Sequence, residues 1–195
     1  MKMSFDEITK QIMTDPKNKK FTERGGAPLY KASKKAKIVI VGQAPGKKAE
    51  ASGLFWNDPS GDRLREWMGV SREEFYTTDK IAHLPMDFYF PGKAKTGDNP
   101  PRKDFAAKWH PMILEAMPSI ETIVLIGAYS QKYYLGKARK RNLTETVRHY
   151  EDYLPDYFPL VHPSPLNYRW HTQNPWFEEQ VVPIFRTFIQ EVLDN

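Results

Sequence analysis

The stretch IVIVGQAPG, residues 38–46, joins four consecutive apolar β-branched residues to a turn rich in glycine and proline. A short run that is apolar on both faces is typical of a buried strand in a parallel sheet. The turn at 42–46 ends this strand abruptly, and its glycines allow the backbone to approach a ligand closely. Parallel sheets place their sites at the carboxyl ends of the strands. The sequence therefore predicts a site just after residue 41.

Other apolar segments alternate between strand and helix patterns along the chain. Strands are predicted at 76–84, 121–127 and 157–161, and a long loop rich in Pro, Gly, Asp and Asn at 85–101. Helices are predicted at 5–13, from a cap at Ser60, after Ser71, around 105–117 and at about 175–193. This alternation predicts an α/β fold, a three-layer sandwich with a central, mostly parallel four-stranded sheet and helices on both faces.

The composition indicates a water-soluble globular protein. The 195 residues favour a single domain over 1–195, and the absence of cysteine excludes disulfides, a thiolate nucleophile and thiolate-bound zinc or iron-sulfur clusters. A net charge of +5 favours an anionic partner, nucleic acid first. No apolar run is long enough to span a bilayer, and the start lacks the apolar stretch of a secretory signal. We expect a cytoplasmic monomer that binds no membrane.

Two loop motifs carry the chemistry of the sequence. The first, at 42–46, is neither GxGxxG nor a Walker A loop, so dinucleotide and nucleoside-triphosphate binding lose their main support. The second, HPSPLN at 162–167, follows the last strand and has no GxSxG elbow and no second histidine at metal-ligand spacing. Taken alone, the first is compatible with a structural turn and the second with a histidine bonded to backbone at a strand end.

Taken together, in this order and separation, the two motifs resemble the signatures of the uracil-DNA glycosylase superfamily. The segment GLFWNDPSGDRL at 53–64 resembles the part of that superfamily that supplies an aromatic platform and then a helix start. The stretch from Met86 through GDNPPR at 97–102, and NPWFE at 174–178, resemble a bacterial branch without iron-sulfur cysteines. The resemblance covers about residues 35–194 and leaves an N-terminal helix and loop at 1–34.

The resemblance implies a DNA glycosylase of base-excision repair that flips a damaged or deaminated base out of DNA and cleaves its N-glycosidic bond, without metal or cofactor. It implies that His162 donates a hydrogen bond to the departing base and that Leu166 is the wedge. Trp56, or its neighbour Phe55, is expected to be the platform. The remaining expected contacts are Gln43 for the attacking water, Gly42, Ala44 and Pro45 for the base pocket, and Ser60, Ser164, Pro165 and Asn167 for DNA.

Two departures from the family pattern bear on activity. Some relatives carry a carboxylate in the first motif, whereas Gln43 can hold a water but cannot accept its proton. The residue that reads the base edge, Asn in uracil-specific branches near the end of the second strand, corresponds best to Asp79, which offers acceptors only. A non-catalytic nucleic-acid-binding protein of the same fold is therefore the alternative. A third possibility, a small-molecule hydrolase on the same fold, is disfavoured because the sequence offers no nucleophile paired with a general base.

Overall fold

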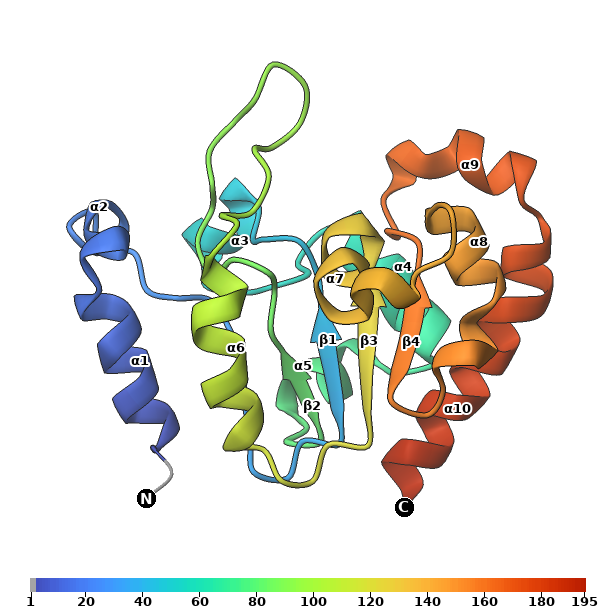
Figure 1. Ribbon diagram of the computed structural model, residues 1–195, viewed down its shortest axis with the longest axis horizontal. Coiled ribbons are helices and arrows are strands. Elements are labelled where there is room, and N and C mark those ends of the chain that lie inside the picture. The colour runs from blue at the N-terminus through green and yellow to red at the C-terminus, as the bar shows by residue number, and fades with distance from the viewer. Residues whose placement is uncertain (1–2) are drawn as a thin grey trace.

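The computed structural model describes residues 3–195, and its centre is a four-stranded sheet in which all strands run parallel (Figure 1). The order across the sheet is β2-β1-β3-β4. Ile38 of β1 is in register with Ile81 of β2 and with Thr122 of β3, and Ile123 of β3 with Tyr157 of β4. The strands are β1 Ile38–Val41, β2 Ile81–His83, β3 Thr122–Ile126 and β4 Tyr157–Leu160.

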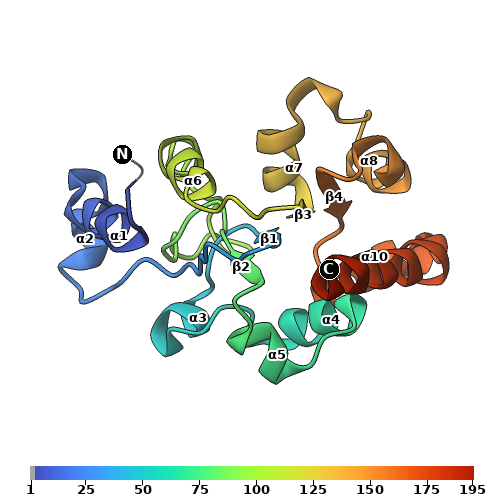
Figure 2. The ribbon, with the colours of Figure 1, turned by 90° about the horizontal axis from the view of Figure 1, so that it is seen from below.

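Each face of the sheet has its own apolar core, because successive side chains of a strand point to opposite faces. Ile38 and Ile40 of β1 belong to one buried cluster, whereas Val39 and Val41 belong to the other. The first cluster includes side chains of α4, α5 and α10, and the second includes side chains of α1 and α6. Figure 2 shows these two layers of helices on either side of the sheet. The predicted three-layer sandwich is confirmed.

Two helices begin at capping signals that the sequence contains. Ser4 and Glu7 form the reciprocal capping box of α1, and the Ser71 hydroxyl accepts the Glu74 N–H at the start of α5. The α-helices are α1 Phe5–Thr14, α2 Lys19–Thr22, α3 Lys47–Ser52, α4 Pro59–Met68, α5 Arg72–Thr77, α6 Phe105–Glu115, α7 Gly127–Leu135, α8 Leu143–Arg148, α9 Tyr168–Gln173 and α10 Val182–Asp194. Short 3-10 turns lie at Pro16–Asn18, Gly136–Ala138, Tyr150–Tyr153 and Pro165–Asn167, and a π turn at Phe177–Val181 precedes α10.

Two predicted boundaries are wrong. The segment 76–84 is not one strand, because α5 extends to Thr77 and β2 begins only at Ile81. Ser60 does not cap α4: the Asp58 carboxylate accepts the Gly61 N–H at 2.9 Å, and Pro59 occupies the first helical position. The start of α4 differs because a helix begins where one of several neighbouring polar groups reaches the free backbone N–H groups, and here that group is the Asp58 carboxylate.

The predicted long loop at 85–101 connects β2 to α6 and is tied down at both ends. The Asp87 carboxylate is fully buried and accepts hydrogen bonds from the Arg102 side chain at 2.6 and 2.8 Å. Between these anchors, the Asn99 N–H donates to the Gly92 carbonyl and Lys93 bridges to Asp98, forming a hairpin over 92–99. Figure 1 shows this hairpin projecting beyond the carboxyl edge of the sheet.

A helix that crosses a bilayer needs about 20 predominantly apolar residues. None of the helices within residues 3–195 is both long enough and apolar enough to do so.

Candidate functional site

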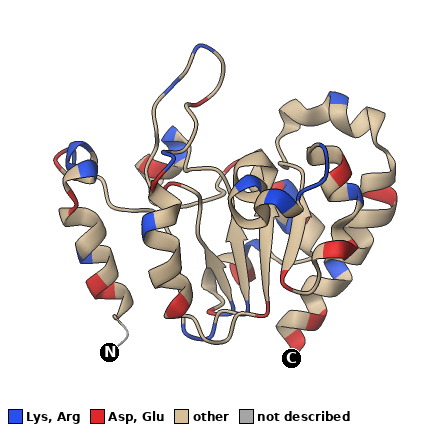
Figure 3. Cartoon of the chain, in the orientation of Figure 1, with Lys and Arg blue, Asp and Glu red and all other residues tan. Residues whose placement is uncertain are grey.

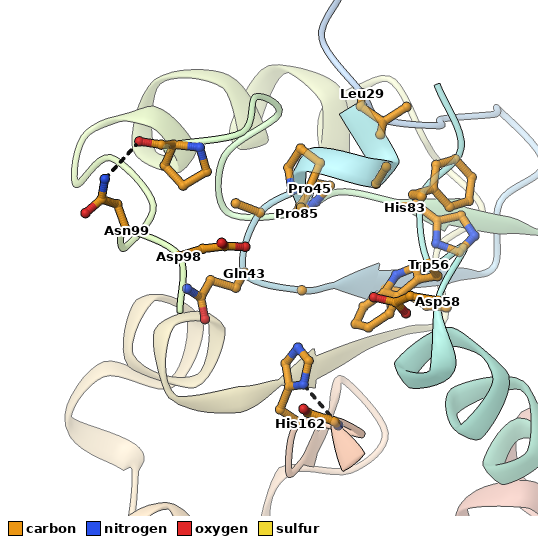
Figure 4. A pocket seen from close by; sticks show the side chains of 18 of the residues that line it. Leu29, Gln43, Pro45, Trp56, Asp58, His83, Pro85, Asp98, Asn99 and His162 are labelled. Carbon is orange, nitrogen blue, oxygen red and sulfur yellow. Dashed lines mark hydrogen bonds between the residues drawn. The ribbon is translucent and has the colours of Figure 1, made fainter. Parts of the chain in front are cut away.

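A cleft of about 410 Å³ opens at the carboxyl edge of the sheet, where parallel α/β sheets place their sites. It lies between the loop after β1, the segment before α4, the end of β2, the hairpin and the loop after β4 (Figure 4). The predicted site residues that line it are Gly42, Gln43, Ala44, Pro45, Phe55, Trp56, His162, Ser164, Leu166 and Asn167. Segments more than 100 residues apart in the chain therefore meet around one cavity.

Trp56 forms part of the cleft wall in a strained backbone conformation. Its φ of 54° is the one positive φ among the non-glycine residues of 3–195, and this region is unfavourable for a bulky side chain. A Cβ at Gly42 would lie 2.9 Å from the indole, and a Cβ at Gly61 only 1.8 Å from the Trp56 carbonyl oxygen. Glycine at these two positions makes the space that the platform occupies.

Buried donors hold the backbone at Trp56. The Arg65 guanidinium, almost fully buried in α4, donates to the Trp56 carbonyl at 3.1 Å. The Tyr76 hydroxyl lies 2.8 Å from the Phe55 carbonyl oxygen and 3.1 Å from that of Trp56. Strained residues persist where the surroundings over-determine them, and they cluster at functional sites. Arg65 and Tyr76 therefore position the predicted platform.

His162, immediately after β4, presents a donor to the cleft. Its Nδ1 accepts the Ser164 backbone N–H at 3.2 Å, so the proton of the neutral ring lies on Nε2. Burial lowers the pKa of His162, and the opposing effect of the Asp58 charge is smaller. Figure 4 shows the ring pointing into the cleft toward Trp56, whose indole lies 5.8 Å from it between ring centres. At neutral pH, His162 is therefore a neutral imidazole that can donate a hydrogen bond through Nε2.

The loop after His162 is rigid at its base and exposed at its tip. Asn167 donates to the His162 carbonyl at 2.7 Å, and the Ser164 hydroxyl accepts the Leu166 N–H. Leu166 stands at the rim with 88% of its surface exposed. An exposed apolar side chain on a rigid loop beside a cleft is suited to insertion between bases.

Asp58 belongs to the segment 53–64, for which the sequence predicts an aromatic platform and a helix start but no role for this carboxylate. One of its oxygens caps α4, and the residue lines the cleft close enough to His162 to influence its titration. Asp98 of the hairpin also lines the cleft, bonded to Lys93 at 2.6 Å. The cleft therefore contains two carboxylates, although the first motif contains none.

Three predicted residues do not line the cleft. Asp79 precedes β2 at the amino edge of the sheet, is about half exposed and pairs with Lys35 at 3.0 Å, so its predicted place in the base pocket is wrong. Ser60 is buried in the first turn of α4, which leaves only 8% of its surface exposed. Pro165 lies in the exposed turn behind Leu166.

The residue that lies in the cleft at the end of β2 is His83, which belongs to neither of the two sequence motifs. It is 1% exposed and stacks on Phe55 with ring centres 4.0 Å apart. The signal that could have found it is its position at the end of a strand that pairs with β1, since Ile40 is in register with His83.

The matched family profile agrees with this geometry. The profile of the uracil DNA glycosylase superfamily matches residues 29–186. The chain belongs to this superfamily. It is also similar to a solution NMR structure of a “putative Uracil DNA glycosylase” from Methanosarcina acetivorans, with 15% identity and a TM-score of 0.49 over 84% of this chain and 96% of the other.

Membership in the uracil DNA glycosylase superfamily gives the chain a glycosylase-like function with a DNA substrate at the level of the family. Within residues 3–195, no group of three or more His, Asp or Glu side chains is arranged to hold a metal ion. The chemistry available in the cleft is that of a neutral imidazole donor, an amide, carboxylates and aromatic surface.

Proposed function

We propose that this protein is a DNA glycosylase of base-excision repair that flips uracil or another deaminated base out of DNA and hydrolyses its N-glycosidic bond. The observation that carries the proposal is the neutral His162, whose proton is directed to Nε2 by the Ser164 N–H, facing Trp56 across the cleft. The superfamily membership supports the reaction class.

His162 acts on the leaving base. Breaking the glycosidic bond leaves the sugar with oxocarbenium character and places negative charge on the base. A hydrogen-bond donor fixed at the position of that charge strengthens its interaction as the bond breaks, and this lowers the barrier. A neutral N–H is sufficient, because the donor keeps its proton while the base departs as an anion.

Asp58 supplies the acceptor for the proton of the attacking water. Gln43 holds a water through its amide, but it cannot take up the proton. The Asp58 carboxylate lines the same cleft and keeps one oxygen outside its cap interaction with Gly61. The charge of Asp58 also stabilises the developing positive charge on the sugar.

Leu166, Ser164 and Asn167 serve the flipping step. Unstacking a nucleotide costs a few kcal/mol, which a wedge in the vacated space and an aromatic platform for the flipped base offset. Leu166 has the exposure that a wedge requires, and Trp56 has the wall position that a platform requires. We infer that the chain acts as a single domain and a monomer on DNA in the cytoplasm.

Single-turnover excision on oligonucleotides containing uracil, hypoxanthine or xanthine tests this proposal, with alkaline cleavage of the abasic product as readout. We expect His162→Ala to lower the rate constant by about 10²–10³, and Asp58→Asn by about 10²–10⁴, with little change in DNA affinity. Asn retains a capping oxygen for Gly61, so Asp58→Asn tests the charge and not the helix cap.

The alternative, a nucleic-acid-binding protein that does not cleave, predicts a different outcome. Wild type would then bind the oligonucleotides and release no base from any of them. If wild type is active and His162→Ala excises at the same rate, this side chain takes no part in the reaction. Exposed His149 of the α8 cap provides the matched control, because His149→Ala should excise at the wild-type rate.

A further inference from the structure

A second cavity lies beside the cleft, on the other side of α3. It has a volume of about 490 Å³ and lies between α2, the glycines after α2, α3 and the base of the hairpin. Gly46 and Ala49 line the cleft. Lys47 and Glu50 line the second cavity, which we call the α2–α3 groove. Residues three apart share a helix face, so α3 is a wall with one face toward each cavity. Pro91, just before the hairpin, lines both, and the two cavities are therefore neighbours.

The rim of the α2–α3 groove carries three positive charges. Lys20 lies in α2, Arg24 in the turn that follows it, and Lys47 begins α3. Within residues 3–195, none of these three side chains forms an ion pair with a carboxylate, whereas the adjacent Lys19 pairs with Glu23 at 3.6 Å. The unpaired cations are thus gathered at the groove, where an anion can approach all of them.

The floor of the α2–α3 groove is apolar and fixed to its surroundings. Phe21 of α2 stacks on Tyr89 with ring centres 4.7 Å apart. Glu50 is the one carboxylate among the groove's lining residues, and one of its oxygens accepts the Phe90 backbone N–H at 2.9 Å, which ties α3 to the base of the hairpin. The positive charges therefore outnumber the negative one. An apolar floor below a cationic rim suits a chain of alternating sugars and phosphates.

We propose that the α2–α3 groove binds phosphates of the DNA strand on one side of the nucleotide held in the cleft. This inference rests on DNA as the substrate of the function proposed above and gives that strand a second contact. An α-helix with its side chains is about 10–12 Å across, and the phosphates of one strand advance about 3.4 Å each along the duplex axis. With α3 as the wall, the groove receives the phosphate about three nucleotides from the flipped one.

Two observations favour a DNA strand over a small free anion. The groove shares α3 and Pro91 with the cleft, and its cations come from two elements, so they follow a path and do not converge on one point. Figure 3 shows Lys and Arg on both α2 and α3. In addition, Lys20 and Arg24 precede residues 29–186, which match the superfamily profile, so this chain adds them to the matched segment.

Removal of the charge from one phosphate at a time tests the contact. The probe is a duplex with a tetrahydrofuran abasic analogue, in which a methylphosphonate replaces a single phosphate at successive positions on either side. We expect the affinity of wild type, measured by fluorescence anisotropy, to fall about threefold at a position about three nucleotides away, on one side only, because an exposed ionic contact contributes about this much.

Lys20→Gln with Arg24→Gln should remove this response, so that the methylphosphonate at that position no longer weakens binding. On the unmodified duplex, the slope of log affinity against log salt should fall by about 1.8, since each phosphate contact contributes about 0.9. Lys10→Gln with Lys19→Gln is the matched control, because it also removes two positive charges and neither residue lines the groove. It should keep the wild-type response, and thermal melting should show that both variants are folded.

If no position distinguishes wild type from the variant of Lys20 and Arg24, the strand does not enter the groove and the proposal is wrong. A saturable shift of the Gly25 and Gly26 amide NMR signals with inorganic phosphate, together with such a result, would assign the groove to a small anion. The abasic analogue has no base to excise, so the scan does not depend on turnover. A position-specific response without excision of any base would count against the hydrolytic function alone, and excision without that response against the groove alone.

Discussion

Gly61 shows how one missing side chain determines the shape of the cleft. It lies in the first turn of α4, where a helix ordinarily disfavours glycine. The Trp56 carbonyl occupies the place that a Cβ at Gly61 would take, and Arg65 and Tyr76 donate hydrogen bonds to that carbonyl. The positive φ of Trp56 and the glycine at 61 are therefore two parts of one local arrangement.

Gly61→Ala should destabilise the protein and displace Trp56. A Cβ placed 1.8 Å from a backbone oxygen forces the 56–61 segment to move, and overpacking of this kind costs about 1–3 kcal/mol. We expect a lower melting temperature and altered tryptophan fluorescence. Gly46→Ala is the control, since its φ is −75° and the nearest atom, on Asp98, is 3.8 Å away. Equal losses in the two variants would contradict this account of Gly61.

At the scale of elements, β2 shows why part of the site was not predictable from the sequence. The Ser71 cap predicts that a helix begins, but nothing in 72–80 fixes where it ends. The extent of β2 is set by pairing with β1, where the Leu84 N–H donates to the Ile40 carbonyl and His83 is in register with Ile40. An offset of four residues separates Asp79, outside the cleft, from His83, inside it.

The loops after β1 and β4 were easier to place. Each follows a run of four or five apolar residues, so the strand ends are marked by composition alone. Gln43 and His162 therefore fall at the predicted edge, and the sheet brings them into one cleft. What composition does not indicate is that Asp58 caps α4 beside them, because the choice among Asp58, Pro59 and Ser60 is made by backbone geometry.

Leu166→Ala tests the 3-10 turn as a wedge. The side chain is 88% exposed and contributes little to the core, so the fold should keep its stability. Excision from base-paired DNA should fall more than excision from single strands, because an unpaired base needs less help to leave the stack. The ratio of single-turnover rates on the two substrates measures this. Ile184→Ala, at an exposed apolar position of α10, is the matched control.

A decrease of equal size on single and double strands would show that Leu166 contributes to binding and not to flipping. An unchanged rate on both substrates would remove the turn from the mechanism.

For the whole molecule, the fold class follows from the sequence because both cores come from a simple alternation. Odd and even residues of β1 point to opposite faces of the sheet, and apolar side chains of helices cover each face. The distribution of charge does not follow in the same way. Four lysines flank β1 in the sequence, namely Lys34, Lys35, Lys47 and Lys48. The two pairs lie at opposite ends of the strand, so the length of the strand keeps them apart.

The structure places these lysines at opposite edges. Lys47 and Lys48 begin α3 directly after the cleft-lining Gly46, and Lys34 and Lys35 lie before β1, where Lys35 pairs with Asp79. Figure 3 shows Lys and Arg on α3, on the hairpin and beside α7 at the cleft edge, with a second group on the loop before β1. Of the two groups, only the one on α3, on the hairpin and beside α7 lies at the edge where the cleft opens.

The salt dependence of DNA binding can distinguish the two groups of lysines, because two double variants can be compared that have the same net charge. Lys47→Gln with Lys48→Gln, and Lys34→Gln with Lys35→Gln, each remove two positive charges from the net +5. Removing one lysine that binds a phosphate should reduce the slope of log affinity against log salt by about 0.9 for duplex DNA, because fewer condensed counterions are released. We expect the slope, measured by fluorescence anisotropy, to fall for the α3 pair and to stay at the wild-type value for the other. Breaking the Lys35–Asp79 pair should matter little, since an exposed ion pair contributes at most about 1 kcal/mol to stability. Equal slopes in the two double variants would mean that the protein responds to DNA through its total charge, and the cleft edge would then not be the surface that follows the phosphates.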